Sequence, residues 1–336
     1  LEREINHNIQ KRQKELELTI ALTNYCNFSC VYCYQNKNEK LMTTEVANMI
    51  IEKIDRILND NIFEGINIHY FGGEPLLNIP VLIYLDENIK KITDKIGIVY
   101  KAFLTTNGSM LSKELLQKVK FSSIQLTFDG LEKTHDRLRV SDHFHFKEEI
   151  ELIENIMNFS QAKVLLRTNI CKENKDEIIA LHKYIFEKFG NERIEINPNR
   201  TIKYHQDDSF EMLSVQEYAE VAYQIKLLWS EQKGKFELPV PRSTPCKFPY
   251  GNAYAISPEG YCTFCSGSMD QEKKYFFDVD IENKKMFSVR KECKKCNILP
   301  LCLGGCIIQY NLRAGACTYE KYELKNILIS YIKHIS

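Results

Sequence analysis

This sequence of 336 residues lacks a net charge, a long apolar run and a secretion signal. Lysine plus arginine and aspartate plus glutamate each number 45, so no global field attracts nucleic acid or an anionic membrane. No apolar run approaches the roughly eighteen residues of a membrane span, and the polar residues 1–17 contain no signal-peptide core. Internal repeats and low-complexity tracts are also absent. We therefore predict a cytoplasmic protein that binds neither nucleic acid nor membrane.

Cysteine, in contrast, is abundant for a cytosolic protein, with twelve residues in the chain. Three lie at 26–33, Cys171 stands alone, and eight crowd between Cys246 and Cys317. A disulfide framework would be spread more evenly through a small secreted domain. The number and the clustering therefore indicate that most of these cysteines hold metal.

The first two hundred residues alternate between strand-like and helix-like patterns. Runs of β-branched and aromatic residues occur at 16–22, 66–71, 98–106, 123–128, 163–170 and 193–197, and apolar residues at helical spacing lie between them. Six strand–helix repeats predict a parallel sheet, either a partial barrel or an open doubly wound sheet. In both folds, chemistry gathers at the C-terminal ends of the strands.

After residue 200 this alternation stops, and we predict a second module. A polar segment, 1–15, precedes the α/β unit at 16–200, and a bridging helix and proline-rich loop follow at 201–245, with the helix at 215–229. The cysteine-rich domain spans 246–318 and contains a hairpin of strands at 253–256 and 261–264. Residues 319–336 form the last unit, with a closing helix expected at 319–332.

The first cysteine group directly follows the first predicted strand. Cys26, Cys30 and Cys33 have the spacing C-x3-C-x2-C, which we interpret as an iron–sulfur site. Full protein ligation of a cubane takes four thiolates, so three leave one iron vacant, and that vacancy would be the active site. The second strand ends in Phe71-Gly72-Gly73-Glu74-Pro75. The two glycines would let the backbone approach a ligand closely, and Glu74 could accept a hydrogen bond from an ammonium group. A tight turn before the next helix would also explain the Gly-Gly-Glu-Pro residues.

These residues together resemble the radical S-adenosylmethionine (SAM) superfamily, which has a C-x3-C-x-aromatic-C loop followed by Gly-Gly-Glu-Pro. The resemblance implies a partial (β/α)6 TIM-like barrel in which the amino and carboxylate groups of SAM chelate the vacant iron. An electron delivered through the cluster would then yield a 5′-deoxyadenosyl radical. Three later segments, Thr127–Gly130, His135–Arg139 and Arg167–Asn169, are similar to further motifs of the family. The resemblance implies that the cofactor-binding residues are Tyr32, Gly72, Gly73, Glu74, Pro75, Thr127, Arg139 and Asn169.

The downstream cysteines have the most specific spacing in the chain. Cys246 is followed by Gly260 and Cys265, and then come Cys293-x2-Cys296-x5-Cys302-x3-Cys306 and Cys317. This pattern is similar to the SPASM extension of radical SAM enzymes. By resemblance, one auxiliary 4Fe–4S cluster would take Cys293, Cys296, Cys302 and Cys317, and a second would take Cys246, Cys265 and Cys306.

Cys262 would be the fourth ligand of the second auxiliary cluster, which makes three 4Fe–4S clusters in all. If Cys262 points away, that cluster keeps an open iron that a substrate thiol could occupy. Cys171 is left over and is expected to be a small buried hydrophobe. A zinc ribbon is the competing interpretation, but it would explain Cys293 and Cys296 and not the triad at Cys26.

Relatives with a SPASM extension mostly modify peptides or protein side chains. The leading hypothesis is therefore an enzyme, a radical SAM oxidoreductase that matures a ribosomally made peptide by installing a thioether or carbon–carbon crosslink. The runner-up is a sulfatase maturase that makes formylglycine from Cys or Ser. Phe71 and Ser266 count against it, because those enzymes have Gln and Asp at these positions. A third hypothesis, from another class, is an iron–sulfur electron-transfer protein.

The expected partners are a precursor peptide and a reducing electron donor such as flavodoxin or ferredoxin. The 25 residues before Cys26 are too few for the winged-helix leader-recognition domain of many peptide maturases. Recognition would then fall to the barrel mouth, a sheet edge or a separate protein. The run Lys247-Phe248-Pro249-Tyr250 could contact a peptide or pack the bridge between modules. The sequence identifies no catalytic acid or base.

Overall fold

The computed structural model places most of the chain. It describes residues 2–12, 14–60, 63–190, 192–203, 209–234, 238–243, 246, 248, 252–263, 265–267, 274–279, 288–306 and 317–335.

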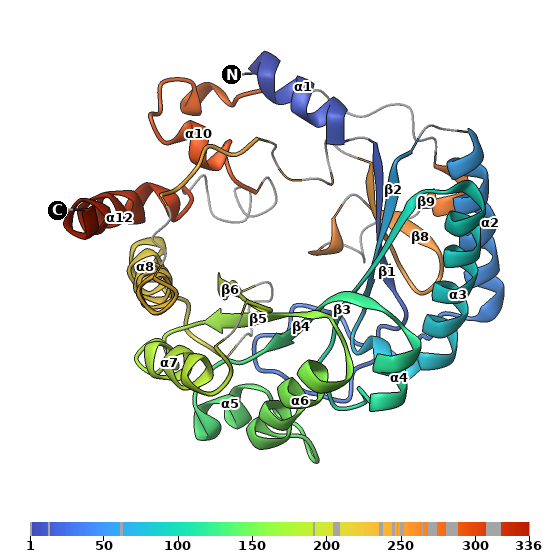
Figure 1. Cartoon of the computed structure of the whole chain (residues 1–336), viewed down its shortest axis with the longest axis horizontal. Coiled ribbons are helices and arrows are strands. Elements are labelled where there is room, and N and C mark those ends of the chain that lie inside the picture. Colours follow the sequence, from blue (N-terminus) through green and yellow to red (C-terminus); the bar gives the residue numbers. More distant parts are fainter. Residues whose placement is uncertain are drawn as a thin grey trace.

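Six parallel strands form the main sheet in the order of the chain. They are β1 (Glu15–Ala21), β2 (Gly65–Phe71), β3 (Val99–Thr105), β4 (Phe121–Thr127), β5 (Lys163–Ile170) and β6 (Ile194–Arg200). The helices between them are α2 (Thr44–Asp60), η1 (Pro75–Asn78), α3 (Ile79–Ile96), α4 (Lys113–Lys118), α5 (Glu132–Leu138), α6 (Phe146–Phe159) and α7 (Ile178–Phe189). Because the strand order never reverses, the crossovers all return on one side, and the helices lie outside the strands (Figure 1). The sheet is therefore a partial barrel, and the doubly wound alternative is wrong.

The predicted hairpin is present, and it joins the main sheet. Strands β7 (Ala253–Ile256) and β8 (Tyr261–Thr263) are antiparallel, and β9 (Lys274–Tyr275) follows. Strand β7 pairs in parallel with β1, which gives a nine-stranded sheet with the order β6-β5-β4-β3-β2-β1-β7-β8-β9. The C-terminal part of the chain is thereby attached to the strand that leads into the Cys26–Cys33 loop.

Helices close the C-terminal side of the molecule. The two helices predicted there are α8 (Val215–Gln232) and α12 (Glu320–Ile335), which pack together through a 2.6 Å ion pair of Lys226 with Glu323. Short helices η3 (Phe276–Asp278), η4 (Lys291–Cys293) and α10 (Leu299–Cys302) lie in the cysteine-rich part. Figure 1 shows α8, α10 and α12 on the side where the row of strands does not close.

The polar N-terminal segment forms a helix that the sequence did not predict, α1 (Glu2–Arg12). Its Ile5 and Ile9 lie four residues apart, on one face, and pack against Leu303. The carboxylate of Glu2 accepts the backbone N–H of Val289 at 2.7 Å. Helix α1 therefore supports the cysteine-rich part. Among the described residues, no helix has the length and hydrophobicity needed to cross a membrane.

The buried His182 on α7 makes the stability of the fold depend on pH. Its Nδ1 accepts the indole N–H of Trp229 at 3.0 Å, and its Nε2 lies 3.2 Å from the hydroxyl of Thr168. Burial lowers the pKa of His182 from 6.5 to about 3. Between these values the unfolded chain binds more protons than the folded chain, so stability is lost as the pH falls below 6.5.

We expect His182 to lower the free energy of unfolding by about 1.4 kcal/mol between pH 7.5 and pH 5.5. Anaerobic urea unfolding of the wild type and of His182→Gln at both pH values measures this contribution. The variant should have the shallower pH dependence. An identical dependence in both proteins would contradict the assignment.

Candidate active site

The Cys26–Cys33 loop starts where β1 ends, and two glycines hold its beginning in place. The Gly73 N–H donates to the carbonyl of Thr23 at 2.8 Å, and the Glu74 N–H donates to the carbonyl of Tyr25 at 2.9 Å. A Cβ atom on Gly73 would lie 2.2 Å from the Tyr25 carbonyl oxygen, and one on Gly72 would lie 2.4 Å from that of Thr23. The glycines are therefore needed because the start of the cysteine loop lies against them.

Glu74 is fully buried and ties the ends of β2 and β3 together. Its Oε1 accepts the N–H of Leu76 at 2.9 Å and the hydroxyl of Thr106 at 2.7 Å, and its Oε2 accepts the N–H of Asn107 at 2.6 Å. Burial raises the pKa of Glu74, and these hydrogen bonds oppose the shift. The side-chain amide of Asn107 in turn donates to Asn27 in the cysteine loop at 2.8 Å. By sequence alone, the Asn107-Gly108 pair is typical only of a turn.

Cys30 lies among charged neighbours as well as the other two thiols of the loop. Its pKa is raised to about 11, mainly by burial, while Arg139 opposes the rise and Cys33, Asp129 and Cys26 add to it. The loop backbone is fixed on its other side, because the N–H groups of Ser29 and Val31 donate to carbonyls at 138–140 at 2.8 and 3.0 Å.

The spacing of these thiols fits an iron–sulfur cluster. In the part of the chain that the structure describes, no three His, Cys, Asp or Glu side chains converge on a point to hold one metal ion. Each iron of a cubane takes its own thiolate, so the ligands surround a volume instead of meeting at a point. Cys26, Cys30 and Cys33 are half-buried residues of one loop, and we predict that they hold such a cluster.

Tyr32 links the cysteine loop to the ends of β4 and β5. Its hydroxyl donates to Asp129 Oδ2, and Asp129 Oδ1 accepts the backbone N–H of Asn169 at 2.6 Å. The buried side chain of Asn174 donates to the carbonyls of Asp129 and Asn169 at 2.7 and 2.8 Å, a role that the sequence did not reveal. Thr127 is the last residue of β4 and is nearly buried. Of the predicted SAM-binding residues, Tyr32, Thr127 and Asn169 therefore lie around Asp129 or at the carboxyl ends of β4 and β5.

Arg139 carries donors that fit the carboxylate of SAM. Its guanidinium lies 5.3 Å from the centre of the Phe28 ring, and only 6% of the side chain is exposed. Among the described residues, neither Nε nor Nη2 of Arg139 has a hydrogen-bond partner. Buried charged donors without partners are costly, and a bidentate carboxylate would satisfy them.

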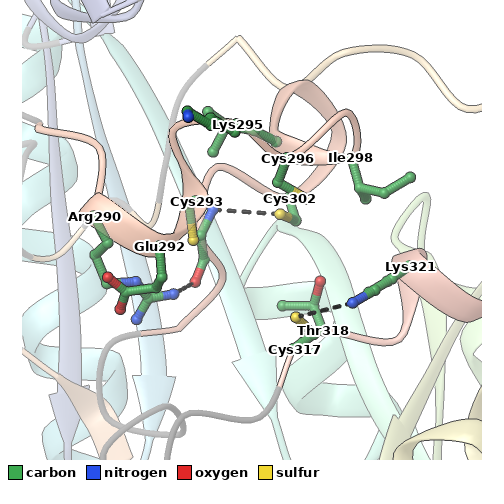
Figure 2. A pocket seen from close by; sticks show the side chains of 12 residues that line it. Arg290, Glu292, Cys293, Lys295, Cys296, Ile298, Cys302, Cys317, Thr318 and Lys321 are labelled. Atoms are coloured by element: carbon green, nitrogen blue, oxygen red, sulfur yellow. Dashed lines mark hydrogen bonds between the residues drawn. The ribbon is translucent and has the colours of Figure 1, made fainter.

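Four of the C-terminal cysteines share one cavity, which has a volume of about 370 Å³ (Figure 2). They are Cys293, Cys296, Cys302 and Cys317, the four that the resemblance assigns to one auxiliary cluster. They come from η4, the turn after it, α10 and the segment just before α12. The ammonium of Lys321 lies 3.9 Å from the sulfur of Cys317 (Figure 2). The cavity thus gathers this set of thiols as a cluster would require.

The other predicted ligands lie in different surroundings. Cys306 lines a second cavity, of about 270 Å³, together with the ends of β6 and the starts of α8 and α12. Cys246 is exposed and Cys265 is half-buried, whereas Cys262 is only 3% exposed and belongs to the main hydrophobic core. Cys171 is fully buried, as predicted.

Phe248, of the run at 247–250, and two residues of β2, His69 and Tyr70, have structural surroundings. Phe248 is buried and packs against Ala253 and Ala255, whereas Lys247, Pro249 and Tyr250 lie outside the described residues. His69 Nε2 lies 2.7 Å from the Thr105 hydroxyl, and Tyr70 is fully buried.

Comparison with known proteins identifies the family. Residues 20–185 match the model of the Radical SAM superfamily. The chain contains a radical SAM domain. This match supports SAM binding and the iron–sulfur cluster of that superfamily, as the Cys26–Cys33 motif predicts. The C-terminal cysteine pattern is consistent with the SPASM type.

Among curated proteins, the radical SAM cyclopropyl synthase TigE of Paramaledivibacter caminithermalis is 24% identical, over 97% of this chain and 76% of TigE. The uncharacterized protein MJ0907 of Methanocaldococcus jannaschii is 34% identical over 34% of this chain and 39% of that protein. A GTP 3′,8-cyclase of Clostridium perfringens is 31% identical, and the aligned part spans 50% of it.

Two solved structures share the fold across almost the whole chain. The anSMEcpe protein with bound AdoMet, which is SAM, has a TM-score of 0.74 and 19% identity, and the match covers 96% of this chain and 98% of that one. SuiB of Streptococcus suis bound to its precursor peptide SuiA has a TM-score of 0.64 and 17% identity, covering 95% and 77%. The radical SAM domain and the cysteine-rich part thus belong to one shared architecture.

Proposed function

We propose that this radical SAM enzyme matures a ribosomally made peptide by installing a thioether or carbon–carbon crosslink. The observation that carries the proposal is the position of the Cys306 cavity beside the predicted SAM pocket. Asn169, at the end of β5, pairs with Asn199 of β6, and Asn199 lines that cavity. A substrate held there would lie between the SAM pocket and the cysteine-rich part.

The lining of this cavity suits a peptide backbone. Arg200 Nε and Glu320 Oε2 are buried and have no hydrogen-bond partner within the described ranges. They offer one donor and one acceptor, and a backbone amide needs one of each. Arg242 holds Glu320 in place through an ion pair of 2.5 Å.

The known proteins support a peptide substrate. SuiB is bound to a precursor peptide, and anSMEcpe has been solved with bound AdoMet and the Kp18Cys peptide. TigE aligns with 97% of this chain and is a cyclopropyl synthase, so its name describes carbon–carbon bond formation.

We also propose three 4Fe–4S clusters per chain. Cys26, Cys30 and Cys33 would hold the SAM cluster, and Cys293, Cys296, Cys302 and Cys317 would hold one auxiliary cluster. The second auxiliary cluster would take Cys246, Cys265 and Cys306. The burial of Cys262 in the main core favours the arrangement in which that cluster keeps an open iron.

When bound, SAM and its cluster supply the 5′-deoxyadenosyl radical that abstracts hydrogen from the peptide. The protein's own contribution is positioning. The Tyr32–Asp129–Asn169 contacts fix the pocket, and Arg139 orients the SAM carboxylate. A reduced flavodoxin or ferredoxin would deliver the electron, and a separate protein would recognise the leader peptide.

The test uses anaerobically purified protein with dithionite, SAM and the short peptide encoded beside its gene. We expect 5′-deoxyadenosine by liquid chromatography and loss of two hydrogens from the peptide by mass spectrometry. Alkylation of the product distinguishes the bonds, because a thioether consumes a cysteine thiol and a carbon–carbon bond leaves it reactive.

Other outcomes of this test would overturn the proposal. If SAM is cleaved but the peptide encoded beside the gene is unchanged, and a sulfatase peptide gains formylglycine, the sulfatase-maturase alternative is established. Protein with full iron content that never cleaves SAM would be an electron-transfer protein.

A further inference from the structure

A cluster of buried ionisable side chains lies next to Asp129 and the cysteine loop. It consists of His135 on α5, Arg139 just after α5, and Glu149 on α6. Glu149 has no exposed surface, and its Oε2 lies 3.0 Å from His135 Nε2 while its Oε1 lies 3.8 Å from Arg139 Nη2. No sequence motif pointed to Glu149. A buried carboxylate is costly unless it is paired, so its position between two basic groups needs an explanation.

Arg139 connects this cluster to the cysteine loop. Burial alone would lower the pKa of Arg139, but Glu149 and then Cys30 raise it by more, so the guanidinium remains fully charged. The backbone on either side of Arg139 accepts hydrogen bonds from Ser29 and Val31. Its charge is therefore held directly beside Cys30, with Glu149 behind it.

His135 connects the same cluster to Asp129, which follows β4. Its Nδ1 accepts the backbone N–H of Asp129 at 3.4 Å, and Asp129 in turn holds Tyr32 and Asn169. Glu149 thus contacts one residue from each side of the site. Moving the Glu149 carboxylate would therefore disturb the Arg139 guanidinium. Through His135, it would also disturb the Asp129 contacts at the ends of β4 and β5.

We propose that Glu149 is a positioning residue that orients the Arg139 guanidinium toward the SAM carboxylate and offsets its charge beside the cluster. This inference rests on the proposed function, because it assigns Arg139 to SAM. It follows from two observations: Nε and Nη2 of Arg139 make no hydrogen bond within the described residues, and Nη2 forms an ion pair with Glu149 at 3.8 Å, too long for a hydrogen bond. Offsetting the charge matters because nearby net charge sets the reduction potential of an iron–sulfur cluster.

The test compares Glu149→Gln with wild type after reconstitution of the clusters. We expect SAM to bind at least about tenfold more weakly, as is typical when a supporting residue is removed. The midpoint potential of the SAM cluster, followed by electron paramagnetic resonance, should move to a more positive value because a negative charge is lost. Glu151→Gln, on the exposed side of α6, is the matched control and should change neither quantity.

A second variant separates charge from geometry. Glu149→Asp keeps the charge but shortens the side chain, so SAM binding should weaken without the shift in potential. This variant also tests the inference if Glu149→Gln fails to assemble its clusters. If a Glu149 variant with full iron content has the same SAM affinity and the same midpoint potential as the wild type, the inference is overturned. The proposed function is unaffected by that result as long as the wild-type protein cleaves SAM. Absence of SAM binding in the wild type would instead overturn the proposed function.

Discussion

Replacing Cys26, Cys30 and Cys33 together by alanine will reduce SAM cleavage to the background rate and remove about four irons per chain. The three thiols lie in one loop with the spacing C-x3-C-x2-C, so we expect them to act as one ligand set. Cys293, Cys296, Cys302 and Cys317 line one cavity and Cys306 lines another, and the Cys26–Cys33 loop lines neither, so the auxiliary cysteines should keep their iron. Iron analysis and chromatography of 5′-deoxyadenosine under dithionite measure both effects.

The matched control for the triple variant is Cys171→Ala. Cys171 is fully buried beside Leu138 and Phe210, and we assign it no iron. Its replacement should leave the iron content and SAM cleavage as in the wild type. Retention of SAM cleavage by the triple variant would contradict the assignment of the active site.

Gly73→Ala should disable the enzyme without removing any ligand. The new methyl group would lie 2.2 Å from the Tyr25 carbonyl oxygen and 2.6 Å from its carbon, so backbone must move. That movement breaks the two hydrogen bonds that join residues 73 and 74 to the start of the cysteine loop. We expect the free energy of unfolding to fall by about 3 kcal/mol and SAM cleavage to fall with it, because crowding of this kind is strongly destabilising. Urea unfolding and the 5′-deoxyadenosine assay measure the two effects.

Gly97→Ala provides the comparison for this glycine. Gly97 has a φ of +82°, but nothing lies within 4 Å of an added Cβ atom. Its replacement should therefore cost only the backbone strain of about 1 kcal/mol and should leave SAM cleavage intact. If both variants lose the same free energy of unfolding and Gly73→Ala still cleaves SAM normally, the close approach of Gly73 to the Tyr25 backbone is unimportant.

Much of the fold could be predicted because its signals are local. Strand β5 was predicted with the bounds that it has, and the other five parallel strands lie within a few residues of the predicted runs. Hydrophobic periodicity acts over a few residues, so it can be recognised without knowing what the segment packs against. Helix α1 escaped prediction because its two isoleucines become a buried face only through Leu303, almost three hundred residues away.

The sequence by itself determined the Cys26–Cys33 loop, the Gly-Gly-Glu-Pro turn and the spacing of the later cysteines. These features are covalent neighbours, and their chemistry follows from residue type and spacing. Only the tertiary structure decided that β7 extends the sheet beside β1, that Cys262 faces the core, and that Glu149 stands behind Arg139. Each of these contacts joins residues from different elements, and their meeting depends on how the whole sheet curves and packs.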